Sequence, residues 1–344
     1  MLFLSSDAYA HKGIDFVGVF NTDDGGQGSL RSAILHANDD EDTQIVFQIP
    51  TSDKGYDSKT GIFTIAPRTP LPVVRAKGTI FDGLAQTLIN DSNKKGPEIR
   101  ISGKNIAPEH GTAPAAGITI TTPQCQVKGV ILSDFAGVAL ALRGEEVVEC
   151  RVQTNVFERN KGADVVLQNG ASGNWIGIAP DASPFDAEFE GIYAEDMGND
   201  FFVSKSDAVR ITGELTKGNS IRGNRFHGTQ TPIVFGLKPL IATPVLKIQR
   251  LESGSMGHQI TVQFTGKPNQ TLTLDWYRSS EESLFADHSE MKMTTHEVKT
   301  DANGVALFKT EVKGYPVGSH AVTITTPEGQ TSAFSNVVVL PYLN

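Results

Sequence analysis

The feature that most constrains this chain is a repeat of short apolar strands and polar corners between residues 129 and 235. Three stretches, beginning at Gly129, Val152 and Gly218, each contain an apolar pair, a polar corner and a second apolar pair. A related fragment begins at Gly173. Self-similarity at a spacing of roughly 20 to 25 residues is typical of stacked repeats. The pattern therefore predicts a coil of short parallel strands.

The residues of each repeat suit such a coil. Inward side chains of one turn stack on those of the next at about 4.8 Å, so Val, Ile, Leu and Phe are expected to form ladders. Asn and Gly are expected at the corners, because Asn can stack amide on amide and both tolerate left-handed backbone. A bulky residue at such a corner would be strained. The irregular, acidic stretch 180–215 interrupts the pattern and is interpreted as an insertion.

An amphipathic helix is predicted near the beginning of the chain, over residues 28–38. Ser29 is a suitable N-cap for it. One face is apolar, with Leu30, Ala33, Ile34 and Ala37 at steps of three and four residues. A coil of stacked strands has an open end with a bare core and therefore needs a cap. We expect this helix to cover the amino-terminal end of the coil.

The pattern changes after Pro239 and Pro244, which mark a short, stiff linker. Seven runs of alternating apolar residues follow, at about 245–251, 259–265, 271–278, 292–298, 305–312, 319–325 and 332–340. Such a series of short strands and turns is typical of an immunoglobulin-like sandwich. The sequence therefore predicts an all-β protein. Residues 13–240 form a right-handed parallel β-helix with an amino-terminal capping helix, and residues 241–344 form a small antiparallel β-sandwich.

Motifs in both parts of the chain point to one family. Phe20-Asn21-Thr22-Asp23-Asp24 precedes Gly28 to Leu35 and Ile45-Val46-Phe47, and Pro70-Leu71-Pro72 precedes Thr79 to Gly83. These motifs resemble the amino-terminal signature of bacterial parallel β-helix surface proteins, which have the pectin-lyase-like fold. Residues 300–304 and 331–336 resemble the carboxy-terminal sandwich of the same family. The resemblance spans nearly the whole chain and implies the fold, but fold does not determine activity.

Charge and hydropathy exclude some partners. The net charge of −9 and the pI near 5.4 disfavour nucleic acid, since phosphate binding needs clustered Lys and Arg. An acidic surface also disfavours anionic lipids, and polyanions such as pectate unless a cation intervenes. No segment approaches the roughly 18 apolar residues of a membrane helix, so no membrane span is predicted. Residues 1–12 contain a small-x-small pattern at Ala8 to Ala10 and are interpreted as the remnant of a secretion signal or a disordered terminus.

Cys125 and Cys150 are the only cysteines of the chain. Two cysteines do not build a disulfide scaffold, and their spacing does not match a metal site. We predict that they are small buried hydrophobes. Their separation in sequence is near the length of one turn of the coil, so a bridge between neighbouring turns is the alternative.

Enzymes with this kind of coil need recognisable groups. A glycoside hydrolase needs two carboxylates that flank the bond, and a lyase needs a base together with a cation, often calcium. The set of motifs found in polygalacturonases is not present. The segment Asn21 to Asp24 resembles two of those motifs superficially, but it lies in the amino-terminal signature rather than on a strand in the middle of the coil.

An acidic constellation in the irregular stretch is the candidate ligand site. It consists of Asp186, Glu188, Glu190, Glu195, Asp196 and Asp200. Glu188 and Glu190 alternate across Phe189, so both can point outward from one strand. One interpretation is a sugar-binding or calcium-binding rim over the coil, with calcium held by Glu188 and Glu190. The other interpretation is a solvated insertion.

The candidate catalytic residues are His227, Arg225 and Arg222. They lie close together in the last repeat, where they could form an acid–base group on an outer face. A histidine without such a role is usually a corner or surface residue. The position of Trp175 in a ladder predicts that it belongs to the core rather than to a sugar-stacking platform, and Trp276 is predicted at the centre of the sandwich.

Two functional hypotheses follow. The first is a non-catalytic, adhesin-like binding or structural protein, secreted or attached to the surface of a bacterium. Its partner would be a polysaccharide or another cell-surface component, and calcium is the one cofactor considered. The alternative is a polysaccharide lyase or glycoside hydrolase of the pectin-lyase-like fold.

Overall fold

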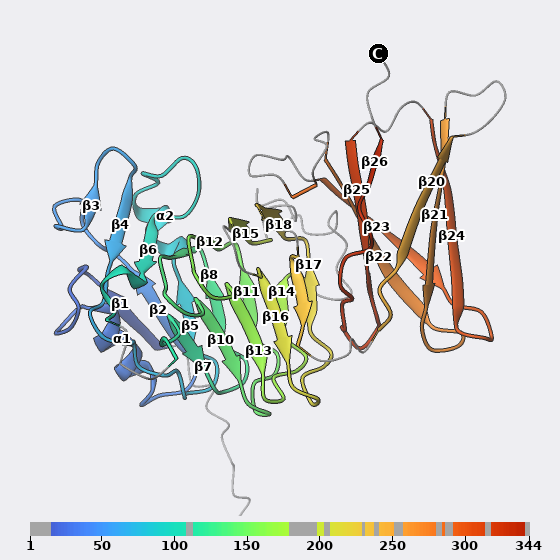
Figure 1. Cartoon of the computed structure of the whole chain (residues 1–344). Helices are drawn as coiled ribbons and strands as arrows, with labels where there is room; N and C mark the ends of the chain where they lie inside the picture. Colours follow the sequence, from blue (N-terminus) through green and yellow to red (C-terminus); the bar gives the residue numbers. More distant parts are fainter. Residues whose placement is uncertain are drawn as a thin grey trace, which may run out of the picture.

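Three sheets of short strands form the larger part of the protein (Figure 1). The computed structural model describes residues 15–107, 113–178, 198–202, 207–228, 231–236, 241–250, 257–279, 284–285, 292–313 and 318–340. Within these residues, sheet A contains β1 (Asp15–Val19), β2 (Thr43–Phe47), β5 (Ile80–Asp82), β8 (Gln126–Lys128), β11 (Arg151–Gln153), β14 (Trp175–Gly177) and β17 (Ser220–Arg222). Sheet B contains β3 (Tyr56–Asp57), β4 (Ile62–Ile65), β6 (Ile99–Ser102), β9 (Val130–Ser133), β12 (Val156–Glu158), β15 (Asp200–Phe202) and β18 (Arg225–His227). Sheet C contains β7 (Ile118–Ile120), β10 (Leu140–Arg143), β13 (Val165–Gln168), β16 (Val209–Thr212) and β19 (Ile233–Phe235).

From β5 onward the chain visits sheets A, B and C in turn, and each turn adds one strand to every sheet. Neighbouring strands are parallel except for β3 and β4, which pair antiparallel. Gln126 pairs with Arg151, and Leu140 pairs with Val165. Both pairs are separated by 25 residues, so the length of these turns lies at the upper end of the predicted range of roughly 20 to 25. The prediction of an all-β chain with a repeat of parallel strands is confirmed, and the arrangement is consistent with a β-helix.

One turn is longer than the others. Asn155 bonds to Val130 of the preceding turn at a sequence separation of 25, but to Asn199 of the following turn at a separation of 44. The additional residues fall between Gly177, where β14 ends, and Asp200, where β15 begins. An insertion is therefore present, but the predicted irregular stretch 180–215 is too long. Its second half contains β15 and β16, which are three and four residues long and too short to stand out in a polar sequence.

Aromatic and amide ladders fill the interior of the coil. Phe157, Phe201 and Phe226 are fully buried and stack, with ring centroids 4.8 and 5.3 Å apart. At a corner between sheets A and B, Asn155 Nδ2 donates to Asn199 Oδ1 over 3.1 Å. The predicted apolar ladders and stacked corner amides are therefore confirmed.

Some corners have left-handed backbone at residues other than Gly or Asn. Gln124 and Glu149 have φ of 60° and 58°, and Asp134 and Arg159 have φ of 60° and 55°. Gln124 Nε2 donates to Glu149 Oε2 over 2.8 Å, and Arg159 Nε donates to Asp134 Oδ1 over 2.8 Å. Bulky residues therefore do occur at such corners, in the left-handed region where strain is expected, and their side chains pair with the neighbouring turn.

The first end of the coil is covered by α1 (Leu30–Ala37). Ser29 Oγ accepts a hydrogen bond from Ser32 N–H, as expected of an N-cap. The predicted face, with Leu30 and Ile34 at 0% and 1% exposure, packs into the same buried cluster as the ladders. The capping helix is thus confirmed. Two shorter helical segments follow, α2 (Leu84–Ile89) and the 3₁₀ helix Gly103–Asn105.

The carboxy-terminal part contains two antiparallel sheets (Figure 1). One is formed by β20 (Val245–Arg250), β21 (Gly257–Thr265) and β24 (Val305–Lys313), and the other by β23 (Lys292–Lys299), β22 (Thr271–Ser279), β25 (Gly318–Thr325) and β26 (Val338–Leu340). Buried side chains from both sheets share one cluster, to which Ile260, Leu274 and Val322 belong. Strands therefore occur in all seven of the predicted apolar runs.

The carboxy-terminal part also closes the second end of the coil. Phe334 packs edge-on against Phe226, the last ring of the phenylalanine ladder, with centroids 5.6 Å apart. Tyr277 of β22 is fully buried in the same cluster as the coil interior. Cys125 and Cys150 belong to this cluster as well, and both are free thiols. Among the helices of the described residues, none is long and apolar enough to cross a membrane.

Candidate functional site

The outer face of sheet B carries the candidate site. Because the phenylalanine ladder of β12, β15 and β18 points inward, the residues on either side of each phenylalanine point outward. The register arranges them in two columns, Val156, Asp200 and Arg225 in one and Glu158, Phe202 and His227 in the other. Polar and aromatic side chains from successive turns therefore lie side by side on this face.

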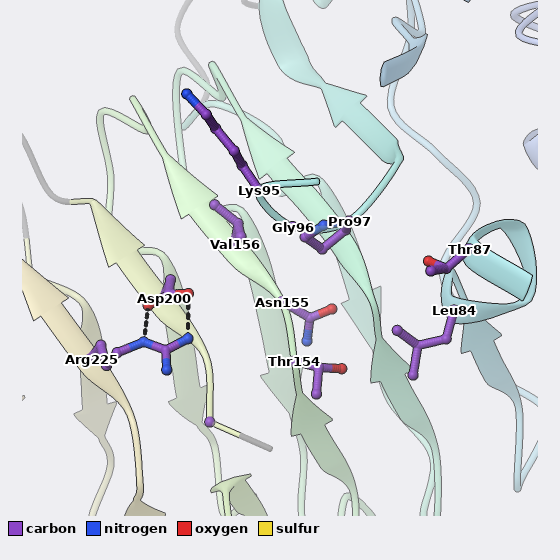
Figure 2. Close-up of a pocket in the computed structure, with 11 residues that line it drawn as sticks. Leu84, Thr87, Lys95, Gly96, Pro97, Thr154, Asn155, Val156, Asp200 and Arg225 are labelled. Carbon is purple, nitrogen blue, oxygen red and sulfur yellow. Dashed lines mark hydrogen bonds and ion pairs between the residues drawn. The ribbon is translucent and has the colours of Figure 1, made fainter. Parts of the chain in front are cut away.

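A groove of about 320 Å³ lies beside the first of these columns (Figure 2). Asp200 and Arg225 form one side, and α2 with the loop after it forms the other, while β12 and the corner before it lie between them. The lining residues are Leu84, Thr87, Lys95, Gly96, Pro97, Thr154, Asn155, Val156, Gly198, Asp200 and Arg225. The groove combines an apolar wall with a few hydrogen-bonding groups, as ligand sites commonly do.

A bidentate ion pair forms the polar side of the groove. Arg225 Nε donates to Asp200 Oδ1 over 2.5 Å, and Arg225 Nη2 donates to Asp200 Oδ2 over 2.8 Å. Burial alone would raise the pKa of Asp200, but the hydrogen bonds from Arg225 and His227 outweigh burial, and the pKa is lowered. Asp200 is therefore ionised at neutral pH, and the pair presents fixed donors and acceptors rather than a transferable proton.

His227 and Phe202 lie in the second outward column, next to this ion pair. His227 Nε2 lies 3.7 Å from Asp200 Oδ1, and the imidazole stacks on the ring of Phe202 with centroids 4.4 Å apart. Phe202 is 41% exposed, so part of its side chain is accessible next to the ion pair. Within the described residues, the buried His227 Nδ1 has no hydrogen-bond partner.

Thr154 forms the strained corner of the groove. Its φ of 55° is in the left-handed region, where a β-branched residue is a genuine outlier. The register places Gly129, which has a φ of 65°, at the same corner of the preceding turn, so glycine is the residue that fits this backbone. Thr154 Oγ1 accepts from Gly129 N–H over 3.2 Å and donates to Gln153 O over 2.6 Å. Such strain is often found at functional sites.

A second carboxylate lies behind the groove. Glu98 Oε2 accepts a hydrogen bond from Thr87 Oγ1 over 2.5 Å, and Thr87 lines the groove. Glu98 itself has no exposed surface, and its Oε1 has no partner among the described residues. It therefore supports Thr87 from below and does not reach a ligand in this conformation.

The predicted catalytic residues separate into two environments. Arg225 and His227 meet at Asp200, as described above. Arg222 does not join them, because its guanidinium is fully buried against Asp275 of β22, with Nε to Oδ2 at 2.6 Å. The idea that Arg222 acts on an outer face fails for this reason, since the carboxy-terminal sheet covers that face.

Most of the predicted acidic rim lies outside the described residues. This applies to Asp186, Glu188, Glu190, Glu195 and Asp196, and therefore also to the predicted calcium site at Glu188 and Glu190. The exception is Asp200, the last residue of the constellation, which lies in the groove. In the described part of the chain, no three His, Cys, Asp or Glu side chains are grouped to hold a metal ion.

The two tryptophans lie in different environments. Trp276 is 8% exposed and belongs to the cluster between the antiparallel sheets, where it was predicted. Trp175 was predicted in the core, but it points outward from sheet A and is only partly buried, with the Arg151 guanidinium 4.4 Å from its ring. Its neighbour Ile176 takes the inward position, so the prediction chose the wrong face of a three-residue strand.

Comparisons with known proteins do not assign the groove. No family model and no curated protein matches the chain. Among solved structures, one match is the enzymatically active domain of tailspike protein 4 of bacteriophage CBA120, with 11% sequence identity and a TM-score of 0.14. The match covers 87% of this chain, which spans 58% of the length of that structure. A TM-score this low does not indicate a shared fold, and the resemblance to bacterial β-helix surface proteins stays a prediction.

Proposed function

We propose that the chain is an extracellular or cell-surface binding protein that holds a segment of a neutral polysaccharide in the groove on sheet B. In this proposal, residues 13–240 form a right-handed parallel β-helix and residues 241–344 form an immunoglobulin-like sandwich that caps it. The observation that carries the proposal is the groove itself, in which an apolar wall faces a fixed ion pair.

The shape and stiffness of the groove support a binding role. Its volume of about 320 Å³ is within the usual range of ligand sites. The polar side is held by two hydrogen bonds between Asp200 and Arg225. The next residues in the two strands, Phe201 and Phe226, belong to the buried phenylalanine ladder and fix the strands from inside. A ligand would therefore meet groups that are already ordered, which lowers the entropic cost of binding.

The chemistry of the groove favours a neutral sugar chain. Hydroxyl groups can both donate to Asp200 and accept from Arg225, while the apolar faces of sugar rings can pack on Leu84, Pro97 and Val156. The net charge of −9 opposes a polyanion. A surface that repeats from turn to turn also suits a polymer of repeating units.

The rival hypothesis is a glycoside hydrolase or polysaccharide lyase. A hydrolase needs one protonated carboxyl and one ionised carboxylate on opposite sides of the bond. Asp200 could only be the ionised member, because its pKa is lowered, and Glu98 would have to move past Thr87 to be the other. The locked ion pair therefore favours binding over hydrolysis.

A binding screen tests the proposal. Calorimetric titration with soluble neutral polysaccharides should give a saturable heat for the intact protein. Arg225→Gln should weaken binding by about 10-fold or more, since hydrogen bonds to charged groups contribute about 1.5–3 kcal/mol. Arg210→Gln is the matched control, because Arg210 also pairs with an aspartate, Asp207, but on sheet C away from the groove.

The same samples distinguish the rival. Release of reducing ends or unsaturated products that disappears in a Glu98→Gln variant would establish an enzyme and overturn the non-catalytic proposal. Equal affinities of the Arg225→Gln and Arg210→Gln variants would remove the groove as the binding site.

A further inference from the structure

Cys125 and Cys150 occupy equivalent positions in two consecutive turns of the coil. Gln126 of β8 pairs with Arg151 of β11, and Arg151 N–H donates to Cys125 O over 2.9 Å. Cys125 directly precedes Gln126 and Cys150 directly precedes Arg151, so the two cysteines lie opposite one another. Both are buried in the coil interior, at 1% and 0% exposure, so their side chains point to the same side.

The strand spacing matches the geometry of a disulfide. Neighbouring strands are about 4.8 Å apart, and the Cα atoms of a disulfide are usually about 4.4–6.8 Å apart. A bond between Cys125 and Cys150 therefore requires rotation of the side chains but no movement of the backbone. The two thiols already interact, since the hydrogen bond with Cys150, together with burial, raises the pKa of Cys125 well above its usual range.

The surroundings of the thiols oppose the bond only weakly. Cys150 Sγ lies 3.5 Å from Thr122 O, and Cys125 Sγ lies 3.8 Å from Ala76 O. Thiols are weak hydrogen-bond donors, so loss of the two S–H groups sacrifices little. The neighbours of the two cysteines in the same column are Thr79 and Asn174, both fully buried. Thr79 Oγ1 donates to Ala76 O, and Asn174 Oδ1 accepts from the Cys150 backbone N–H, so neither hydrogen bond depends on a thiol.

We propose that Cys125 and Cys150 are an oxidative cross-linking site, which forms an intramolecular disulfide when the protein meets a low-molecular-weight disulfide such as oxidised glutathione. Because both thiols are buried, the reaction takes place when the coil opens locally. The thiolate of one cysteine then attacks the small disulfide, forms a mixed disulfide and releases one small thiol. The thiolate of the second cysteine then attacks the protein sulfur of the mixed disulfide and releases the second small thiol. Two protein thiols are thereby oxidised, and one small disulfide is reduced to two thiols.

The bond would join two turns of the coil by a covalent link. It would lie in the turns that directly precede the long turn, and in the unfolded chain it would close a loop as long as one turn. The oxidised form should therefore resist unfolding more than the reduced form. This inference concerns the coil interior and does not depend on the groove on sheet B.

Equilibration in glutathione redox buffers tests the proposal. Reduced protein and previously oxidised protein are each incubated in a series of buffers, with and without denaturing urea, and are then quenched with acid. Free thiols are alkylated after denaturation and counted by mass spectrometry. We expect the folded protein to reach half oxidation at a fraction of oxidised glutathione at least about 10-fold lower than the urea-unfolded chain, because the fold holds the thiols together.

Peptide mapping and single variants identify the bond. Digestion under non-reducing conditions should yield one linked pair of peptides that contains Cys125 and Cys150. Cys125→Ala and Cys150→Ala should each lose this species and form at most a mixed disulfide with glutathione. Equal oxidation of the folded and unfolded chains, or two free thiols in the folded protein at every buffer ratio, would overturn the proposal.

Discussion

Replacement of Asp275 by leucine should strongly destabilise the contact between the coil and the carboxy-terminal sheets. Arg222 Nε and Nη2 donate to Asp275 Oδ2 and Oδ1 over 2.6 and 2.9 Å, and both side chains are 0% exposed. Thr295 Oγ1 donates to Asp275 Oδ1 over 2.7 Å. Without the carboxylate, the buried guanidinium loses its ionised partner.

The magnitude follows from this burial. Loss of one member of a fully buried ion pair costs about 3–5 kcal/mol, much of which is the desolvation of the remaining charge. Asp275→Asn keeps the shape and one acceptor, so it should cost less than Asp275→Leu. Arg222→Met combined with Asp275→Leu removes both charges and should recover most of the lost stability, because replacement of a whole buried pair by apolar residues is often neutral.

Urea unfolding followed by tryptophan fluorescence measures these differences. Trp276 lies between the antiparallel sheets and Trp175 lies on sheet A, so the two parts can be followed separately in Trp175→Phe and Trp276→Phe backgrounds. We expect Asp275→Leu to lower the free energy of unfolding and to separate the two transitions. A cost below about 1 kcal/mol, or a double variant as unstable as the single one, would refute the assignment of a buried, energetically coupled pair.

Three further changes test the coil. Burial raises the pKa of Asp164 to about 8, although a hydrogen bond from Asn160 opposes the shift. Between about pH 4 and 8 the folded state therefore keeps a proton that the unfolded chain loses, and the free energy of unfolding should fall by up to about 1.4 kcal/mol per pH unit. Urea unfolding at several pH values should show this slope, and Asp164→Asn should lose it. Thr154→Gly and Thr154→Ala both lose the two hydroxyl hydrogen bonds, but only glycine relieves the left-handed strain, so Thr154→Gly should be more stable than Thr154→Ala by about 1 kcal/mol in equilibrium unfolding. Phe201→Ala should cost about 3–5 kcal/mol in thermal unfolding and Phe201→Leu clearly less, because Phe201 is a fully buried ring and leucine refills most of its volume. Equal costs for the two variants would contradict this volume argument.

Repeating local patterns could be recognised from the sequence because each was carried by a few neighbouring residues. Leu30 and Ile34 recur at the helical period, and they pack where that period places them. Phe157 and Phe226 sit at equivalent points of two similar stretches, and they belong to one ladder. The periods of strands and helices depend on local backbone geometry, so they can be recognised in the sequence even when the partner strand is unknown.

The candidate site was harder to predict because it is assembled from distant segments. Arg225 and His227 were noticed, but their partner Asp200 stood at the end of an acidic stretch that was read as one irregular loop. The unusual length of that turn concealed the register that pairs Asp200 with Val156 and Arg225. Thr154 carried one usable signal, since it stands where a neighbouring turn has Gly129, but that comparison required the register as well.

The sequence by itself determined the strand repeat, the capping helix and the inward ladders, because these follow from the period of apolar side chains along a short stretch of chain. The tertiary structure alone decided which outward side chains form a site and which are covered. Arg222 and Arg225 are close neighbours in sequence, yet Asp275 buries the first against a distant strand while Asp200 holds the second at a groove. The physical reason is that outward positions carry no periodic signal of their own, and their environment depends on which other segment packs over them.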